Sequence, residues 1–315
     1  MITPGTWPIP AARVAAFVPG IYPRSAGLVQ ATRDFDRGRT SRSSVAEQLD
    51  RDREEFLGVQ LAAGLDLVSD GLLDWQDLFR PLADRCENLD ARPLARFLDT
   101  NTFFRALIAS GRPRLREPIP PPSNDLTGWV GTLPSPLTLA SAIITGAASP
   151  CALAADVLAP QIEAWGRAGS GLIVLEEPFL ADADDGVGLV GGALGELPAE
   201  PALVVRLPFT DAGPLLPKLA ELPLAGIGVD FTVTQLDALP TGLPMRLVAG
   251  VIDARSSRIE DAAELARFGE QLLERGPAGL ALVPNGDLQF VPEPIARAKV
   301  EQLGRARALL NGDPA

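Results

Sequence analysis

Short apolar segments recur along the chain and alternate with longer segments that have helical periodicity. The apolar segments are four to eight residues long, as expected for strands buried on both faces, and they cover residues 13–18, 65–69, 128–133, 172–175, 203–207, 226–230, 245–252 and 280–283. Apolar stripes at helical spacing predict helices at 40–63, 152–168, 214–221, 259–273 and 292–310. This alternation predicts one domain over residues 1–315, an α/β fold of the (β/α)8 TIM-barrel type.

Residues 84–122 interrupt the alternation and end in a proline-rich stretch at 118–122. The rhythm resumes afterwards, so this segment is predicted to be an insertion after the second strand, made of short helix or strand. The alternative fold, a doubly wound open sheet, usually has a glycine-rich phosphate loop after an early strand. The glycines of 186–192 follow no suitable strand, and they predict a flexible loop over the barrel mouth.

Two helix starts carry the pattern of a capping box, in which a serine is followed three residues later by glutamate. The pairs are Ser44 with Glu47 and Ser257 with Glu260.

Charge and composition narrow the function classes. The chain has 28 Lys and Arg against 40 Asp and Glu, a net charge of −12, whereas nucleic acid and anionic membranes bind basic surfaces. No apolar run reaches the roughly 18 residues of a membrane span, and the first residues lack the basic start of a signal peptide. These features predict a soluble cytoplasmic protein with neither nucleic acid nor membrane as a partner.

The chain has no histidine and only two cysteines, Cys86 and Cys151. The commonest general base and the commonest metal ligand are therefore missing. A zinc site would need both cysteines together with carboxylates, so no metal is predicted.

Carboxylates and other polar side chains follow the predicted strands. Glu176 and Glu177 end the strand at 172–175, and a proline then stops it. In a barrel the carboxyl ends of all strands open on one face, where catalytic residues gather. Tyr22, Arg24, Asp70, Asp74, Asp77, Asp230, Asp253, Arg255 and Asn285 lie at or soon after other strand ends, as do Thr138, Asp211 and Asp287. The alternative is a solvated acidic rim, or a structural ion pair between the two glutamates and a neighbouring arginine.

Like charges that converge in one mouth cost folding energy unless a ligand, an arginine or a proton compensates them. The candidate compensating residues are Arg24, Arg80, Arg105 and Arg255. Such a mouth suits a ligand with an amino group, and an arginine suits its carboxylate. An amino-acid-like ligand is therefore expected.

Six segments, in order, resemble signatures of the cobalamin-independent methionine synthase family. They are residues 17–24 (FVPGIYPR), 68–77 (VSDGLLDWQD), 133–138 (LPSPLT), 176–180 (EEPFL), 250–256 (GVIDARS) and 283–288 (VPNGDL). Together they resemble the catalytic C-terminal barrel of that family in its short, stand-alone form. The resemblance implies a barrel fold and methyl transfer to a thiol.

The departures from the family fall on the residues that carry its chemistry. The family binds zinc through a His-x-Cys pair after the fifth strand, a Glu after the sixth and a late Cys; here these places hold 205–208 (VRLP), Asp230 and Gly286. The family zinc is therefore predicted to be absent. The Ser and Glu that help hold homocysteine are replaced at Ile21 and Leu72, while the Asp of its Asp-Glu-Pro motif becomes Glu176.

The resemblance implies an S-methyltransferase with a reduced folate or a methylated corrinoid protein as donor and homocysteine or a similar small thiol as acceptor. Glu176 and Asp230 are the predicted catalytic residues. Glu176 is also predicted to bind the substrate, together with Glu177, Asp70, Asp74, Asp77, Tyr22, Arg24, Asp253, Arg255 and Asn285. Two alternatives stay open: a ligand-binding or partner barrel that has lost catalysis, and metal-free chemistry such as that of the related porphyrinogen decarboxylases.

Overall fold

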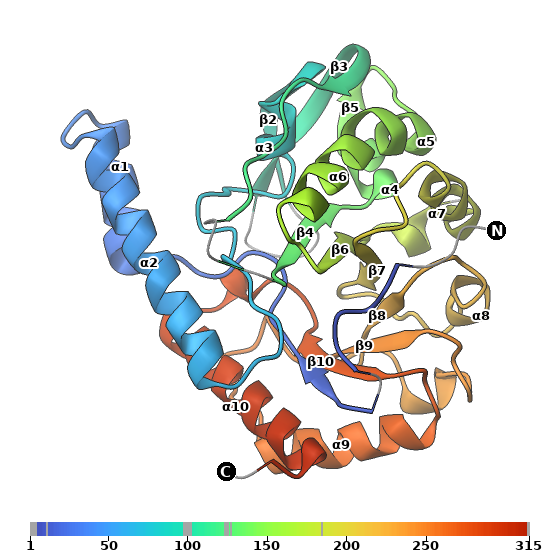
Figure 1. Cartoon of the computed structure of the whole chain (residues 1–315). Coiled ribbons are helices and arrows are strands. Elements are labelled where there is room, and N and C mark those ends of the chain that lie inside the picture. Colours follow the sequence, from blue (N-terminus) through green and yellow to red (C-terminus); the bar gives the residue numbers. More distant parts are fainter. Residues whose placement is uncertain are drawn as a thin grey trace.

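A curled sheet of parallel strands forms the centre of the molecule (Figure 1). The computed structural model describes residues 5–10, 12–96, 103–122, 126, 128–183 and 185–313. Within them the sheet has seven strands in the order β1-β10-β9-β8-β7-β6-β4, all paired in parallel. The strands are β1 (Ala15–Ala16), β4 (Val130–Pro134), β6 (Leu172–Glu176), β7 (Ala202–Leu207), β8 (Gly226–Asp230), β9 (Arg246–Ile252) and β10 (Leu280–Pro284). The predicted TIM-barrel class is thus confirmed.

The predicted second strand at 65–69 is an irregular segment without a regular ladder. It still bridges the two edges of the sheet: the Asp66 amide donates to Ala16 O at 2.9 Å, and the Val130 amide donates to Val68 O at 2.8 Å. Ser69 Oγ also donates to Val18 O at 2.8 Å. The segment therefore takes the place of the missing strand between β1 and β4.

Helices cover the outside of the sheet, and α1 and α2 form a hairpin that projects from it (Figure 1). The helices are α1 (Ala26–Asp36), α2 (Arg42–Ala62), α3 (Arg80–Ala83), α4 (Pro136–Ser141), α5 (Pro150–Leu153), α6 (Ala159–Arg167), α7 (Gly186–Leu194), α8 (Leu216–Leu219), α9 (Ala262–Glu274) and α10 (Glu293–Asn311). The π-helical turn η1 (Ala154–Leu158) joins α5 to α6, and the 3-10 turns are η2 (Leu180–Asp182), η3 (Leu236–Ala238) and η4 (Leu288–Phe290).

Three local predictions were wrong. The glycine-rich segment expected to be a flexible loop is the helix α7, whose Val187, Val190 and Leu194 are buried. Neither predicted capping box is present: Ser41 caps α2 and Asp261 caps α9, each through its side-chain oxygen. Better-placed oxygens three and four residues from the predicted capping serines accept the free amide groups of the first turns.

The predicted insertion after the second strand is an antiparallel hairpin, at the top of Figure 1. Its strands are β2 (Cys86–Arg96) and β3 (Phe103–Leu115), and β5 (Ile143–Thr145) pairs with β3 in parallel. Residues 97–102 of the predicted insertion lie outside the described residues. Most positions of the hairpin are exposed or half-buried, which explains why no continuous apolar run predicted its strands.

Each strand of the barrel sends alternate side chains to two separate cores. The inner core contains the pairs Leu172 and Val174 on β6, and Ala202 and Val204 on β7, together with Trp7 and Ile9 from the N-terminal segment and equivalent residues of other strands. The other strand positions join the outer core beneath the helices. The alternation matters because the last inward positions of β6 and β7 are Glu176 and Arg206.

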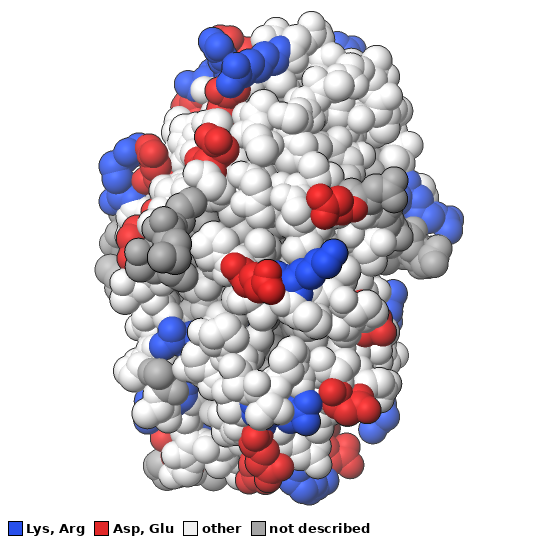
Figure 2. All heavy atoms as spheres, turned by 90° about the vertical axis from the view of Figure 1, so that its right-hand side faces the viewer, with Lys and Arg blue, Asp and Glu red and all other residues white. Residues whose placement is uncertain are grey.

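Charged side chains of both signs are scattered over the face shown in Figure 2, with wide uncharged areas between them. The net charge of −12 is therefore not gathered into one acidic patch on this face. No described helix is long and apolar enough to cross a membrane.

Candidate active site

A buried arginine joins two carboxylates at the C-terminal end of the barrel strands. Arg206 Nε donates to Glu176 Oε2 at 2.9 Å, and Arg206 Nη2 lies 2.5 Å from Glu176 Oε1. Nη2 also lies 3.5 Å from Asp287 Oδ1, and Nη1 donates to Pro284 O at 3.2 Å. Glu176 and Arg206 are partners in the register of β6 and β7, so the sheet itself places their side chains next to each other.

Two glycines make room for the arginine. A Cβ at Gly228 would lie 2.7 Å from Arg206 Cγ, so the guanidinium stem can cross β8 only where there is no side chain. Gly20 has a φ of +84°, and a Cβ there would lie 2.0 Å from Asp287 Oδ1 and 3.1 Å from Arg206 Nη2. The ion-pair cluster therefore depends on residues of both neighbouring segments.

Burial dominates the electrostatics of Glu176, which is 4% exposed. It raises the pKa of Glu176 from the ordinary 4.5 to about 7; Arg206 opposes the increase, and Asp287 and Glu177 add to it. Burial also raises the pKa of Asp287. Within the described residues, Glu176 Oε1 has no donor aligned on it as a hydrogen bond, although the guanidinium is close. Glu176 can therefore exchange a proton near neutral pH.

A small cavity of about 40 Å³ lies over this cluster. The insertion contributes Phe103 and Phe104 of β3 to its wall, so the hairpin reaches the barrel mouth. The other lining residues are Ile21, Asp77, Leu78, Phe79, Glu176, Pro208, Phe209, Asp287, Gln289 and Phe290. An aromatic wall around carboxylates gives an enclosed site for a small group.

Glu177 faces a different set of partners from Glu176. It accepts hydrogen bonds from Ser135 Oγ and from the Phe179 amide, the second at 3.1 Å. Ser135 in turn caps α4 by accepting from the Thr138 amide. Burial raises the pKa of Glu177, and these hydrogen bonds oppose the increase. Its contacts hold the β4 and β6 loops together.

Asp230, the other predicted catalytic acid, is 1% exposed and its oxygens are fully engaged. Oδ1 accepts from the amide and hydroxyl of Thr232, at 2.8 and 2.6 Å. Oδ2 accepts from the Phe209 amide at 3.1 Å and from Asn285 Nδ2 at 3.0 Å. Asn285 Oδ1 accepts from the Ala254 amide at 2.8 Å. Asp230 and Asn285 thus fix the loops after β7, β8 and β9.

Tyr22 and Arg24 contact the loops and helices beside the mouth. The Tyr22 ring stacks on Phe56 with centroids 3.9 Å apart, and burial raises the pKa of its hydroxyl. Arg24 donates to the carbonyl oxygens of Leu73 and Trp75 at 2.7 and 2.8 Å. Arg24 therefore holds a loop, and its side chain is committed to backbone carbonyls.

Asp253 and Arg255 follow β9 at the rim. Asp253 Oδ1 accepts from the Arg255 amide at 2.9 Å, and the Asp253 side chain lines a shallow pocket of about 280 Å³ with Thr232. The Arg255 guanidinium lies 4.2 Å from the centroid of the Phe209 ring. Arg255 thus contacts a ring in the wall of the small cavity and is not itself among the lining residues that the structure describes.

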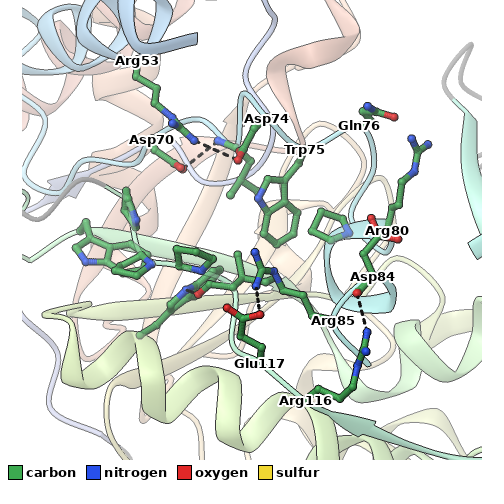
Figure 3. A pocket seen from close by; sticks show the side chains of 18 residues that line it. Arg53, Asp70, Asp74, Trp75, Gln76, Arg80, Asp84, Arg85, Arg116 and Glu117 are labelled. Atoms are coloured by element: carbon green, nitrogen blue, oxygen red, sulfur yellow. Dashed lines mark hydrogen bonds and ion pairs between the residues drawn. The ribbon is translucent and has the colours of Figure 1, made fainter. Parts of the chain in front are cut away.

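The acids after the second strand separate into two places. Asp77 lines the small cavity, but Asp70 and Asp74 line a larger pocket of about 770 Å³ beside it. Figure 3 shows this larger pocket, where Asp74 pairs with Arg53 at 3.2 Å and Glu117 pairs with Arg85 at 3.5 Å. The prediction that all the acids share one mouth was therefore wrong for Asp70 and Asp74.

Arg80, one of the four predicted arginines, compensates Asp77, but the residue that compensates Glu176 and Asp287 was not among the four. Arg206 does so, while Arg80 pairs with Asp77 at 3.1 Å and Arg105 donates its amide to that aspartate. The phenylalanines of the cavity were not among the predicted site residues. A signal for Arg206 exists in the sequence, because it is a lone charge at the last inward position of an apolar strand.

The side chains at the family's zinc positions do not fit a zinc ion. Arg206 is a cation and would repel the metal ion. Both carboxylate oxygens of Asp230 already accept hydrogen bonds. A Cβ at Gly286 would lie 2.3 Å from Phe209 Cζ, so a ligating side chain has no space there. Among the residues that the structure describes, no three His, Cys, Asp or Glu side chains are grouped as a metal site.

Comparison with curated proteins gives partial matches to one enzyme. The chain is 46% identical over 74 residues to the 5-methyltetrahydropteroyltriglutamate–homocysteine methyltransferase of Streptomyces coelicolor, and 38% identical over 117 residues to that of Streptomyces avermitilis. These matches take in 22% and 33% of this chain and only 10% and 15% of the relatives. No family model matches the chain.

Two solved structures are similar over nearly the whole chain. A B12-independent methionine synthase from Shewanella sp., in complex with selenomethionine, superposes with a TM-score of 0.74 at 15% identity, over 94% of this chain and 97% of that one. A methyltransferase from Methanosarcina mazei gives a TM-score of 0.53 at 14% identity, over 95% of each chain. The chain therefore has a fold like that of the cobalamin-independent methionine synthases.

Proposed function

We propose that this chain is a methyltransferase that moves a methyl group to the sulfur of homocysteine or a similar small thiol. The observation that carries the proposal is the buried pair of Glu176 and Arg206 at the barrel mouth, with the pKa of Glu176 at about 7. A thiol reacts as its thiolate and has an ordinary pKa near 8.5. A base that accepts a proton near neutral pH and a fixed cation beside it are the two groups that favour the thiolate.

Glu176 takes the proton of the thiol in this proposal, because this residue lines the small cavity and its Oε1 has no aligned donor. Arg206 stabilises the negative charge that then develops on sulfur. The attacking electron pair forms the new carbon–sulfur bond, and the donor keeps the electrons of the bond that breaks. Asp230 acts as a positioning residue, since its four hydrogen bonds hold the loops that carry Phe209 and Asn285.

The predicted donors are a reduced folate and a methylated corrinoid protein. The partial similarity to methyltransferases acting with a methyltetrahydropteroyl donor supports the first. The Shewanella neighbour was solved with selenomethionine, the selenium analogue of a methylated homocysteine, which supports a thioether product. The decarboxylase alternative is less well supported, because a polyanionic substrate needs several cations, and this cluster offers one guanidinium whose charge two carboxylates already share.

The test is the purified protein with homocysteine and each donor in turn, with methionine as the readout. Glu176→Gln should lower kcat about 100-fold or more if the carboxylate is the base. Glu163→Gln, an exposed residue of α6, is the control and should leave turnover unchanged. If homocysteine stabilises the fold but no donor gives methionine, the ligand-binding alternative is favoured; if no thiol binds and none is methylated, the proposal is refuted.

A further inference from the structure

The small cavity combines aromatic walls with buried carboxylates. Phe79 packs against Phe104 with centroids 4.9 Å apart, and Phe209 packs against Phe290 with centroids 5.6 Å apart. All four rings line the cavity together with Glu176, Asp77 and Asp287. Phenyl rings beside carboxylates attract cations whose surfaces are apolar, as the aromatic cages that bind quaternary ammonium groups do.

The carboxylates of the cavity already accept hydrogen bonds from the protein, and this favours an alkylated cation over a primary ammonium as the ligand. Asp77 already accepts from the amides of Phe79, Arg80 and Arg105, at 3.0, 2.8 and 3.2 Å. Asp287 faces Arg206 and accepts from Gln289 Nε2 at 3.0 Å.

In the described wall of the cavity, Glu176 Oε1 is the carboxylate oxygen without an aligned donor. A primary ammonium has three N–H groups that need acceptors, and these would compete for carboxylate oxygens that already face donors. A fully methylated onium has none.

The size of the cavity sets a limit on the group that fits. About 40 Å³ is roughly three times the volume that one water needs, which suits three or four heavy atoms. A trimethylsulfonium head has four heavy atoms and a tetramethylammonium head has five. Both come close to this limit, because bonded atoms overlap and take less space than separate waters. The ring system of a folate is too large, so it would have to bind outside this cavity.

The balance of charges at the site also favours a bound cation. Glu176 and Asp287 share the single guanidinium of Arg206, and burial raises the pKa of both. A bound cation would favour the ionised form of these carboxylates.

We propose that the cavity formed by Phe79, Phe104, Phe209, Phe290 and Glu176 binds the methylated head of an onium compound, and that a methylsulfonium held there is a methyl donor. The donor part rests on the proposed thiol methylation. In the reaction, the thiol proton passes to Glu176 and the thiolate attacks one methyl carbon. The carbon–sulfur bond of the donor breaks, its electron pair stays on the donor sulfur, and a neutral thioether leaves.

Calorimetry with four small probes tests the binding part at pH 8. Trimethylsulfonium and tetramethylammonium should bind at least tenfold more tightly than methylammonium and neutral tert-butanol, because only the first two combine charge with a surface of methyl groups. Equal binding of tert-butanol would show that charge does not matter, and equal binding of methylammonium would refute the acceptor argument.

A pair of matched variants locates the site. Phe290 and Phe268 are both half-buried, and each packs edge-to-face on one other phenylalanine, with centroids 5.6 and 5.5 Å apart. Phe290→Leu should weaken binding of trimethylsulfonium at least threefold, whereas Phe268→Leu on α9 should leave it unchanged. Thermal unfolding of both variants shows that each is folded. Equal affinity in the two variants would overturn the assignment of the cavity.

Methyl transfer from trimethylsulfonium to homocysteine, followed as methionine and dimethyl sulfide, tests the donor part. Transfer from trimethylsulfonium but not from tetramethylammonium is expected, because a thioether is the better leaving group. If trimethylsulfonium binds but methionine forms only with a folate or corrinoid-protein donor, the donor assignment is wrong and the proposed function stands. If no donor gives methionine, the proposed function itself fails, and the binding results still decide whether the cavity holds an onium.

Discussion

Replacing Glu176 with glutamine removes one buried titratable group and keeps the shape of its side chain. Burial raises the pKa of Glu176 from 4.5 to about 7, although Arg206 lies against it. A carboxyl group with a raised pKa binds more protons in the folded than in the unfolded state. The free energy of unfolding therefore falls as the pH rises from about 4.5 to 7, and this contribution is not recovered at higher pH.

The magnitude follows from the two pKa values. Their difference corresponds to on the order of 3 kcal/mol, of which roughly 2 to 3 kcal/mol is lost between pH 5 and pH 8. Glu176→Gln has no titratable group at this position, so its free energy of unfolding does not contain this pH-dependent contribution. The chain has no histidine, so the other groups expected to titrate in this range are chiefly the remaining buried carboxyls, which wild type and variant share.

Urea unfolding at pH 5, 6, 7 and 8 measures the effect as the free energy of unfolding extrapolated to water. The wild type should lose about 2 to 3 kcal/mol more than Glu176→Gln across this range. Glu163→Gln, an exposed change on α6, should follow the wild type. Parallel curves for the wild type and Glu176→Gln would refute the reasoning, because they would mean that Arg206 keeps Glu176 ionised throughout.

Three further changes test the packing around the site, each by urea unfolding. Arg206→Met leaves Glu176 buried without its cation and should cost about 3 to 5 kcal/mol at pH 8, and less at pH 5, where the carboxyl is protonated. Asp230→Ala removes the acceptor of four hydrogen bonds and should cost about 3 kcal/mol or more. Gly286→Ala places a Cβ 2.3 Å from Phe209 Cζ and should cost about 1 to 3 kcal/mol, most of it recovered in the double variant with Phe209→Leu.

Controls separate these effects from general damage. Asp253→Ala removes an acceptor at a half-buried position of the rim and should cost less than about 1 kcal/mol, in contrast with Asp230→Ala. A cost for Arg206→Met that is the same at pH 5 and pH 8 would show that lost packing, and not the unpaired carboxylate, is responsible. Additive costs for the changes at Gly286 and Phe209 would show that the two side chains do not compete for space.

Periodicity predicted the barrel well because a strand buried on both faces has a continuous apolar signal. The prediction for 226–230 matches β8, and that for 203–207 differs from β7 by one residue. The hairpin of β2 and β3 lacked that signal, since most of its residues are exposed or half-buried. The segment 65–69 was predicted to be a strand from its apolar residues, but it forms no regular strand ladder. The apolar residues of this segment predicted where it comes in the order of strands. They could not predict its hydrogen bonds, because those are made to residues distant in sequence.

The site was harder to predict because it depends on strand register. The sequence identifies Glu176 as an acid that ends a strand, and Arg206 as a charge inside an apolar run. Neither observation says that the two residues are opposite each other, since a shift of one residue in the pairing of β6 and β7 would send them to different faces. Val174 and Val204 point toward the barrel axis as part of the inner core. Side chains alternate along a strand, so Glu176 and Arg206, each two residues further on, also point inward. A buried cation there requires a carboxylate partner, so the pair follows from the packing of the apolar residues beneath it.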